Sequence, residues 1–259
     1  MNVLVAIPVF NEEQRLAKSL GTLHHFLSRS CRFEFDLVIA DNGSVDQTAE
    51  VARALAKAHT GVRVVRLREK GRGRALKRVW GESRADILSY MDVDLSTDLN
   101  CFPPLVESLL CGGFDLAVGS RLLKPALTTR GVKRESISRA YNLLVRSLFH
   151  TQFSDAQCGF KALTKQAAGV LLPLVEDNNW FMDTELLILA ETFGFRIFDM
   201  PVKWADSSES RVKICRTAWE DLVGLLRLRR SLWQGRLAQQ SQAWLSARTS
   251  VKHRTQDSK

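Results

Sequence analysis

Short, continuous apolar runs alternate with helical patterns along the first hundred residues of this chain. Residues 2–7 (NVLVAI) form such a run, which is typical of a strand covered on both faces. Leucines then recur at intervals of four and three from Leu16 to Leu27, so 11–27 is predicted to be an amphipathic helix. The same patterns predict strands at 35–40, 62–67 and 86–91 and helices at 44–58 and 71–81. This alternation predicts βαβ units and an α/β fold with a Rossmann-like, mainly parallel sheet flanked by helices.

The second half of the chain is less regular. Strands are predicted at 114–119 and 196–202 and helices at 137–149 and 183–193, with a dense polar segment at 155–161. No internal repeat and no clear linker occurs before about residue 205. We therefore predict one domain at 1–210 with halves at 1–100 and 101–210, a basic amphipathic helical tail at 211–247, and a disordered end at 248–259.

The predicted tail carries most of the positive charge. The chain has 37 Lys and Arg against 28 Asp and Glu, and residues 211–259 hold eleven of the basic and three of the acidic residues. Trp219, Trp233 and several Leu alternate with Arg there, so a helix in this segment can lie in a membrane interface and bind anionic headgroups. The alternative is a helix that packs its apolar side on the domain and leaves its Arg in water. No run of about 18 uncharged apolar residues occurs, so no membrane-spanning helix is predicted.

Polar, charged or Gly-rich segments follow all four predicted strands of the first half. Ligands bind at the carboxyl ends of the strands in such sheets, and these segments would meet at that edge. The segments are Pro8–Glu13, Asp41–Ser44, Lys70–Arg74 and Asp92–Ser96.

Asp92 and Asp94 are one residue apart at the end of a predicted buried strand. Residues i and i+2 of a strand face the same way, so the two carboxylates would repel one another unless a cation lay between them. Hard oxygen ligands suit Mg²⁺ or Mn²⁺, which keep waters and bridge to substrate phosphates. The alternative, a chance Asp-x-Asp in a solvated loop, is disfavoured by the position after a buried strand.

Two further segments have both a binding interpretation and an ordinary one. The glycines of Lys70–Arg74 allow close backbone approach, and the following helix offers N–H groups to an anion, which suits a phosphate site. A solvated basic turn is an equally open alternative for this segment taken alone. The segment lacks the spacing of a Walker loop and of a GxGxxG dinucleotide motif. Asp41 is placed to accept hydrogen bonds from a nucleobase or a ribose, although Asn42-Gly43 is also ordinary turn chemistry.

Taken together, the motifs resemble those of the inverting glycosyltransferases of family 2, which have the GT-A fold. PVFNEE, DNGSVDQT, KGRGRA and DVDLST occur in the order and at about the spacing of that family. Further along, GSR, DAQCGFK, WFMDTELL and SRVK resemble its polyprenyl-phosphate branch, which contains dolichyl-phosphate β-glucosyltransferases and mannose synthases. The resemblance covers about residues 1–215 and implies a nucleotide-sugar half at 1–100 and an acceptor half at 101–210.

The resemblance implies roles for the matched positions. The implied nucleotide-binding positions are Pro8, Phe10, Glu12, Asp41, Lys70 and Asp92. The implied metal positions are Asp92, Asp94 and Ser96, with Mg²⁺ or Mn²⁺ as the cofactor. The implied catalytic positions are Asp94, Arg121, Arg134 and Arg211, the three Arg being similar to groups that hold the lipid phosphate and the donor diphosphate. Arg139 competes with Arg134 for that match, Asn42 departs from the commoner Asp, and the roles of Asp183 and Glu185 stay open.

The implied reaction moves a hexose, with glucose favoured over mannose, from UDP-glucose or GDP-mannose to a polyprenyl phosphate. Negative charge develops on the departing diphosphate, where a divalent ion with nearby Lys and Arg stabilises it most in the transition state. A hydroxyl acceptor would need a general base, whereas a polyprenyl phosphate is already an anion at pH 7. Many Arg and no indispensable His therefore fit a phosphate acceptor.

Other functions remain open on the sequence alone. A glycosyltransferase with a soluble hydroxyl acceptor would use the same site, and a nucleotidyltransferase would share the phosphate chemistry but not the motifs of the second half. A nucleic-acid-binding protein would fit the pI of about 9.6, but the charge is concentrated in the tail and no nucleic-acid-binding motif occurs, so no such partner is expected. The five scattered Cys form no disulfide or zinc pattern, so we expect a cytoplasmic protein, peripheral on the cytoplasmic face of the membrane.

Overall fold

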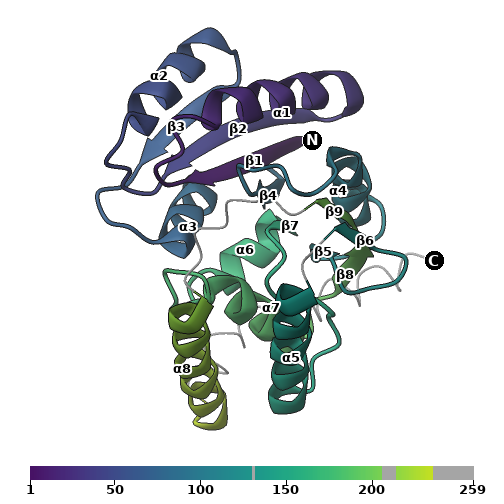
Figure 1. The fold of residues 1–259 in the computed structure, drawn as a ribbon. Coiled ribbons are helices and arrows are strands. Elements are labelled where there is room, and N and C mark those ends of the chain that lie inside the picture. The colour runs from purple at the N-terminus through teal and green to yellow at the C-terminus, as the bar shows by residue number, and fades with distance from the viewer. Residues whose placement is uncertain (130–131, 206–213, 236–259) are drawn as a thin grey trace, which may run out of the picture.

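A seven-stranded sheet of order β3-β2-β1-β4-β7-β5-β8 forms the centre of the protein, of which the computed structural model describes residues 1–129, 132–205 and 214–235 (Figure 1). The strands of this sheet are β1 (Asn2–Val9), β2 (Glu34–Asp41), β3 (Val62–Arg66), β4 (Ile87–Met91), β5 (Leu116–Ser120), β7 (Phe160–Thr164) and β8 (Ile197–Pro201). Only β7 runs antiparallel to its neighbours β4 and β5. The expected α/β fold with a mainly parallel sheet is confirmed.

Helices flank the sheet, and a second, two-stranded parallel sheet lies beside it. The helices are α1 (Leu16–Ser30), α2 (Thr48–Ala58), α3 (Arg72–Glu82), α4 (Phe102–Leu110), α5 (Val132–Phe149), α6 (Lys165–Leu171), α7 (Met182–Thr192) and α8 (Ile214–Trp233), with a short 3₁₀ turn, η1 (Leu99–Cys101). The small sheet pairs β6 (Leu127–Thr129) with β9 (Lys203–Ala205). In Figure 1, α1 and α2 lie at the β1–β3 end, and α5 and α8 extend side by side at the opposite end.

Helices α1 and α2 begin four or five residues later than the sequence pattern predicts. Residues 11–15 are a loop in which Asn11 has a φ of 56° and the Glu12 carbonyl accepts the N–H of Leu16. Before α2, the Asp46 carboxylate accepts both the N–H and the hydroxyl of Thr48. The leucine spacing marked the helix correctly but not its start, because the loop residues that precede each helix have side chains that a helix also tolerates.

The polar pattern of residues 155–161 does not predict β7, the strand that joins the two halves of the sheet. Its apolar run is interrupted by Lys161, which is 2% exposed. The Lys161 ammonium donates to the Cys158 carbonyl at 2.6 Å, so a charged residue sits in a buried strand with its polar end satisfied. Sequence periodicity alone reads such a residue as solvent-facing.

Helix α8 packs on the domain through one face. Leu225 and Leu228 are buried, and Gly224 lies so close to Phe181 that a Cβ would come within 2.5 Å of the Phe181 ring. Arg227 pairs with Glu185 of α7, its Nη2 lying 2.6 Å from Oε1. Residues 214–233 of the predicted tail therefore form a helix whose inner face packs on the domain, while residues 211–213 and 236–247 of that tail lie outside the described part. The predicted end at 248–259 lies outside the described residues.

Asp221 of α8 is a buried carboxyl group whose ionisation opposes folding. Its Oδ2 accepts from Gln157 Nε2 at 2.7 Å, and it is 2% exposed. Burial, with a further contribution from the Asp177 carboxylate, raises the pKa of Asp221 from 3.8 to about 7. Between about pH 4 and 7 the folded protein holds a proton that the unfolded chain has lost, so this group lowers the free energy of unfolding as the pH rises.

We expect Asp221→Asn to stabilise the protein at pH 8 and to leave it nearly unchanged at pH 4. The amide keeps an acceptor for Gln157 and carries no charge, and the pKa difference sets an upper limit on the order of 4 kcal/mol at pH 8. Urea unfolding of wild type and variant at both pH values measures the effect. Glu50→Gln, which removes an exposed carboxylate paired with Arg53 on α2, is the control. An equal gain at both pH values would contradict ionisation as the cause.

Candidate functional site

The loops after β1, β2, β3 and β4 meet at the carboxyl edge of the sheet, as predicted. Asn11 N–H donates to Ser44 Oγ at 3.0 Å, which joins the first loop to the second. Gly71 N–H donates to Asn42 Oδ1, which joins the second to the third. The third loop reaches the fourth through Arg72, whose Nη2 lies 3.0 Å from Asp92 Oδ1. Direct hydrogen bonds and one ion pair therefore hold the four polar segments together.

The predicted nucleotide-binding residues lie on these loops and on the strand ends that carry them. Asp41, the last residue of β2, is fully buried, and its Oδ1 accepts the N–H of Ser44 at 2.9 Å. Its Oδ2 faces Arg66, whose Nε is 3.2 Å away. The Lys70 ammonium lies 3.8 Å from the centre of the Phe10 ring, a cation–π contact between the first and third loops.

Pro8 and Glu12 complete this set. Pro8 is partly buried in β1, next to Ala40 of β2 in the sheet register. Glu12 N–H donates to Thr48 Oγ1 at 2.8 Å, so the first loop is also tied to the start of α2. The structure thus brings all the predicted nucleotide residues to one edge, while their role toward a nucleotide stays a prediction.

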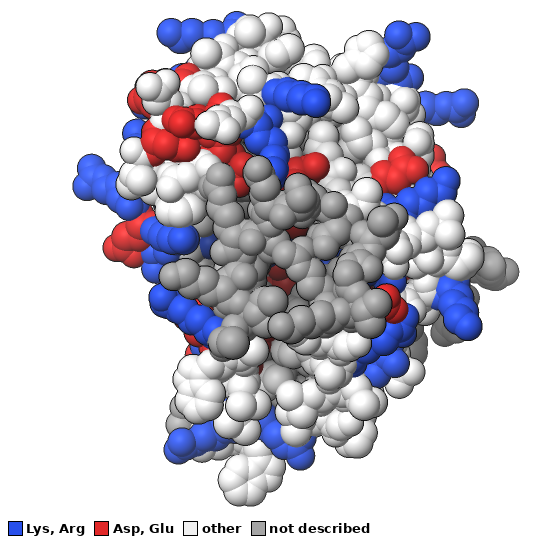
Figure 2. Space-filling model, in the orientation of Figure 1, with Lys and Arg blue, Asp and Glu red and all other residues white. Residues whose placement is uncertain are grey.

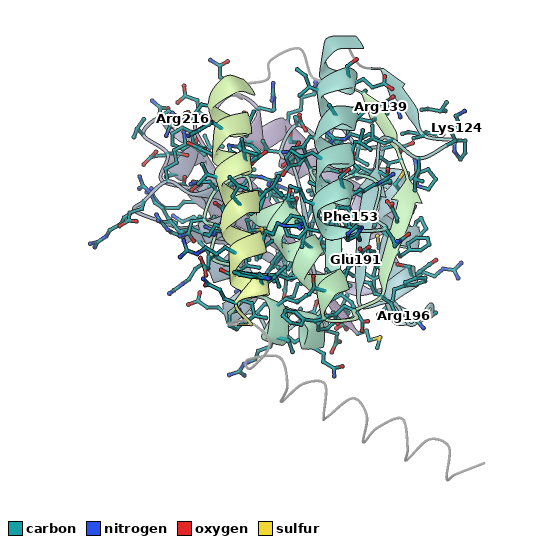
Figure 3. The ribbon with its side chains drawn as sticks, turned by 90° about the horizontal axis from the view of Figure 1, so that it is seen from below. Lys124, Arg139, Phe153, Glu191, Arg196 and Arg216 are labelled. Carbon is teal, nitrogen blue, oxygen red and sulfur yellow. The ribbon has the colours of Figure 1, made fainter. Side chains whose placement is uncertain are left out.

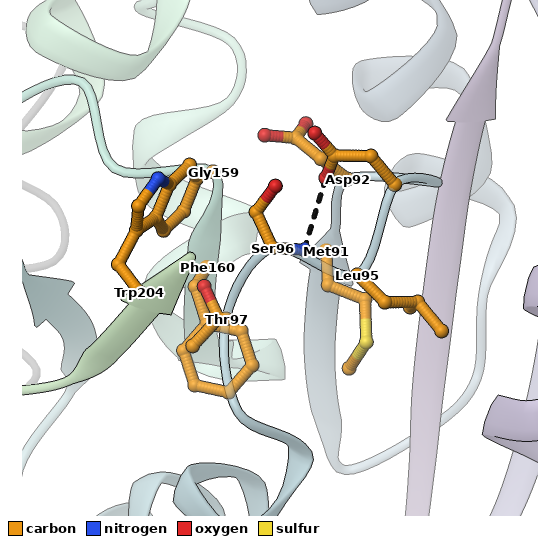
Figure 4. Close-up of a pocket in the computed structure, with 9 residues that line it drawn as sticks. Met91, Asp92, Leu95, Ser96, Thr97, Gly159, Phe160 and Trp204 are labelled. Carbon is orange, nitrogen blue, oxygen red and sulfur yellow. Dashed lines mark hydrogen bonds between the residues drawn. The ribbon is translucent and has the colours of Figure 1, made fainter. Parts of the chain in front are cut away.

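Asp92 and Asp94 come together through a turn, not through a strand. Strand β4 ends at Met91, and the chain then turns with Leu95 N–H donating to the Asp92 carbonyl at 3.1 Å and Leu95 at a φ of 50°. The premise that the two side chains face the same way along a strand was therefore wrong. Both still line one small pocket with Ser96, whose N–H donates to Asp94 Oδ1 at 3.1 Å (Figure 4).

Asp92 is partly buried, with a side chain that is 32% exposed, and it lies against Gly159. Its N–H donates to the Gly159 carbonyl at 3.2 Å, and a Cβ at Gly159 would lie 1.8 Å from Asp92 Oδ2. Burial raises the pKa of Asp92, the Arg72 guanidinium opposes this rise, and the Asp94 carboxylate adds to it. Gly159 was not predicted as a site residue, although it lies in the QCGFK motif, because only the fold brings that motif against Asp92.

The residues of this pocket fit a divalent cation that is bound together with a substrate. Within the described ranges, no three His, Cys, Asp or Glu side chains form a group able to hold a metal ion. Two carboxylates are nevertheless present with Ser96 Oγ, which is buried and has no hydrogen-bond partner among the described residues. Mg²⁺ and Mn²⁺ are commonly held by one or two carboxylates, with waters and substrate phosphates completing the shell.

A buried cluster of charged residues lies behind Asp92. Arg72 contacts both Asp92 and Asp183, and Asp183 also accepts from the Tyr90 hydroxyl and pairs with Lys161. Burial alone would raise the pKa of Asp183, but the charges of Lys161 and Arg72 hold it below its usual value. Arg72 and Lys161 were not predicted as site residues. The sequence could have indicated Arg72 through its place in the KGRGR segment. No sequence pattern connects Arg72 with Asp183, which lies 111 residues further along the chain.

Of the predicted catalytic Arg, only Arg121 has a described side chain. It is 9% exposed and forms two hydrogen bonds to the Asp155 carboxylate, Nε to Oδ2 at 2.7 Å and Nη2 to Oδ1 at 2.8 Å. Burial would raise the pKa of Asp155, yet Arg121 holds it below its usual value. Arg134 lies in α5 with its side chain outside the described part, Arg211 lies outside the described residues, and Arg139 is exposed and paired with Glu135. Their roles stay predictions.

Comparisons with known proteins find a family and relatives that match most of this chain. Residues 4–171 match the family described as Glycosyl transferase family 2. Glycosyltransferase AglD of Haloferax volcanii is 37% identical over 240 residues, which are 90% of this chain and 37% of that protein. Dolichyl-phosphate beta-glucosyltransferase of Mus musculus is 30% identical over 226 residues, 80% of this chain and 68% of that protein. The chain thus spans little more than a third of the first relative and about two thirds of the second.

Solved structures of glucosyl-3-phosphoglycerate synthase from Mycobacterium tuberculosis have a similar fold. The complex of that enzyme with Mn²⁺, uridine diphosphate and phosphoglyceric acid superposes with a TM-score of 0.67 at 19% identity, covering 88% of this chain and 78% of that chain. Its complex with Mg²⁺ and uridine diphosphate gives a TM-score of 0.64. This likeness confirms the expected GT-A fold.

Proposed function

Since the chain belongs to glycosyl transferase family 2, we propose that it moves a hexose, glucose rather than mannose, from a nucleoside diphosphate sugar to a polyprenyl phosphate. The observation that carries this proposal is the pocket where Asp92, Asp94 and Ser96 meet, beside loops suited to a nucleotide. The dolichyl-phosphate glucosyltransferases among the relatives support the glucose and lipid-phosphate part of the proposal.

Asp92, Asp94 and Ser96 would hold Mg²⁺ or Mn²⁺, which neutralises negative charge on the donor diphosphate. An oxygen of the acceptor phosphate forms a bond to the anomeric carbon as the bond from that carbon to the diphosphate breaks. The diphosphate leaves with the electron pair, and attack from the opposite face inverts the configuration. No proton has to be removed from an ionised phosphate, and none of the described residues lining the pocket is a His.

A surface for the lipid substrate is offered by the outer face of α8 and the adjoining face of α5. Trp219, Val223, Leu226 and Trp233 are exposed at helical spacing on α8, opposite its buried face. Leu143 is 66% exposed on α5, and the two helices lie side by side (Figure 3). Arg216 of α8 and Arg139 of α5 are exposed cations on these helices. Figure 2 shows Lys and Arg among uncharged surface at this lower end of the molecule.

We propose that this face rests on an anionic membrane surface, which would make the protein a peripheral membrane protein. In the described part of the chain, no helix has the length and apolar character needed to cross a membrane. Apolar rings with cationic neighbours are the combination that holds a helix at the headgroup level.

Vesicle flotation tests this surface. Trp219→Ala/Trp233→Ala should lower the fraction bound to vesicles containing anionic lipid at least about tenfold, because two large apolar side chains no longer enter the interface. Leu127→Ala, which shortens an exposed apolar side chain on β6, is the matched control. Flotation of the double variant at the wild-type level would rule this face out.

The donor and the acceptor are tested in two steps. Thermal shift with UDP-glucose and GDP-mannose, each with Mg²⁺ or Mn²⁺, should single out UDP-glucose, since a ligand at a hundred times its Kd adds about 2.7 kcal/mol. Labelled donor is then offered with a polyprenyl phosphate or with soluble hydroxyl acceptors such as phosphoglycerate. Label in the lipid phosphate supports the proposal, and label only in the soluble acceptor would replace it.

A further inference from the structure

Arg72 bridges two carboxylates inside the protein. It is 8% exposed, and the two ends of its guanidinium fork serve different partners, Nη2 reaching Asp92 Oδ1 at 3.0 Å and Nη1 reaching Asp183 Oδ2. Its guanidinium carbon lies 4.8 Å from the ring centres of both Tyr90 and Trp180. Packing from two sides and an anion at each end give this side chain one position.

Asp183 is itself fixed from β4 and β7. Its Oδ1 accepts from the Tyr90 hydroxyl and lies 3.2 Å from Lys161 Nζ, and the carboxylate is 2% exposed. Tyr90 and Lys161 are direct partners in the register of the two strands. Two cations and two carboxylates thus lie in contact, and Arg72, Lys161 and Asp183 are buried while Asp92 is partly exposed.

We propose that Asp183 is a positioning residue for the metal and diphosphate site. Acting through Arg72, it fixes the direction in which Asp92 presents its carboxylate to the cation and the donor. This inference rests on the proposed function. Hydrogen-bond partners of a metal-binding carboxylate orient it, and their loss typically costs about 10- to 100-fold in metal affinity or activity. The rival explanation is that Asp183 only anchors α7 to the sheet.

The first test is Asp183→Asn, which keeps the shape of the side chain and removes its charge. Calorimetric titration with Mn²⁺ and UDP should show binding about 10- to 100-fold weaker than in wild type. Steady-state kinetics should show a higher KM for the donor that excess Mn²⁺ partly corrects. Glu82→Gln, which breaks the exposed Arg78–Glu82 pair on α3, is the control. It should change neither the affinity for Mn²⁺ and UDP nor the KM for the donor.

Substitutions of Arg72 separate bridging from charge. A lysine ammonium is a point charge and does not span both carboxylates, so Arg72→Lys should weaken binding of Mn²⁺ and UDP nearly as much as Arg72→Met. Because the two residues act as one unit, the double variant Asp183→Asn/Arg72→Lys should bind Mn²⁺ and UDP no more weakly than the single variant with the weaker binding. Full binding by Arg72→Lys would overturn the positioning role.

A milder variant covers the case in which Asp183→Asn does not fold. Tyr90→Phe removes one hydrogen bond from Asp183 and keeps the ring beside Arg72, so binding of Mn²⁺ and UDP should fall by a smaller factor in a folded protein. A lower melting temperature with unchanged binding, in either variant, would mean that Asp183 only anchors α7.

These outcomes are separate from the test of the acceptor. A wild-type protein that binds Mn²⁺ and UDP but labels no lipid phosphate would contradict the proposed acceptor and leave the positioning role standing. Wild-type binding of neither UDP nor GDP with Mn²⁺ would contradict both.

Discussion

Asp94→Asn should reduce sugar transfer by two to three orders of magnitude while the protein stays folded. Asp94 lines the pocket with Asp92, and its Oδ1 accepts the N–H of Ser96, a bond that an amide oxygen can also accept. The substitution therefore removes a charge and little of the local structure. Initial rates with labelled donor measure the loss, and the melting temperature reports the fold. Excess EDTA should suppress wild-type transfer to a similar extent, and added Mg²⁺ or Mn²⁺ should restore it.

The matched control for this prediction is Asp98→Asn. Asp98 is four residues further on, outside the pocket, where its side chain accepts the N–H of Asn100 at the start of η1. We expect its transfer rate to stay near that of wild type. Full turnover by Asp94→Asn, or by wild type in excess EDTA, would refute the proposed chemistry.

Gly159→Ala should also abolish most of the transfer activity, although it adds one methyl group. The added Cβ would lie 1.8 Å from Asp92 Oδ2 and 2.4 Å from Asp92 Cγ, so the carboxylate has to move. The Asp92 carboxylate, at the end of its side chain, can rotate away at modest cost in stability. It then leaves the pocket that it lines together with Asp94. We expect a loss on the order of 10²-fold in kcat/KM, since misplacement of a site group by about 1 Å has effects of this size.

Gly169→Ala serves as the control for the glycine substitution. Gly169 lies in α6, where an added Cβ meets nothing within 4 Å, and alanine in a helix interior is favoured over glycine by up to about 1 kcal/mol. Its activity should equal that of wild type. If Gly159→Ala keeps full activity with an unchanged melting temperature, the close approach of Gly159 to Asp92 has no part in function.

Much of the first half of the fold could be predicted from local patterns. The buried runs of β1 and β4 and the leucine spacing of α1 each reflect one physical requirement, that apolar side chains face the core at the period of their element. The order of the polar segments after these strands then predicts their meeting at one edge, because parallel strands share a carboxyl end. Strand β7 was not predicted, because the buried charge of Lys161 interrupts its apolar run.

The candidate site was predicted only in part. Asp92, Asp94 and Ser96 were expected together and do lie together, but a turn after β4 brings them there, which the period of a strand does not describe. The inner face of α8 could not be assigned from sequence, because an amphipathic helix with Arg suits both a membrane and a protein surface. On that face, Asp221 contacts Gln157 and Arg227 contacts Glu185, so the helix packs against the protein there.

The sequence by itself determined the alternation of strands and helices, the polar strand ends and the resemblance of their motifs, because each depends on neighbouring residues. Only the tertiary structure decided that Arg72 stands between Asp92 and Asp183 and that Gly159 closes over Asp92. These residues come from four separate elements or loops. The contacts of a buried charge depend on which groups the folded chain brings within a few ångströms, and no local pattern records that.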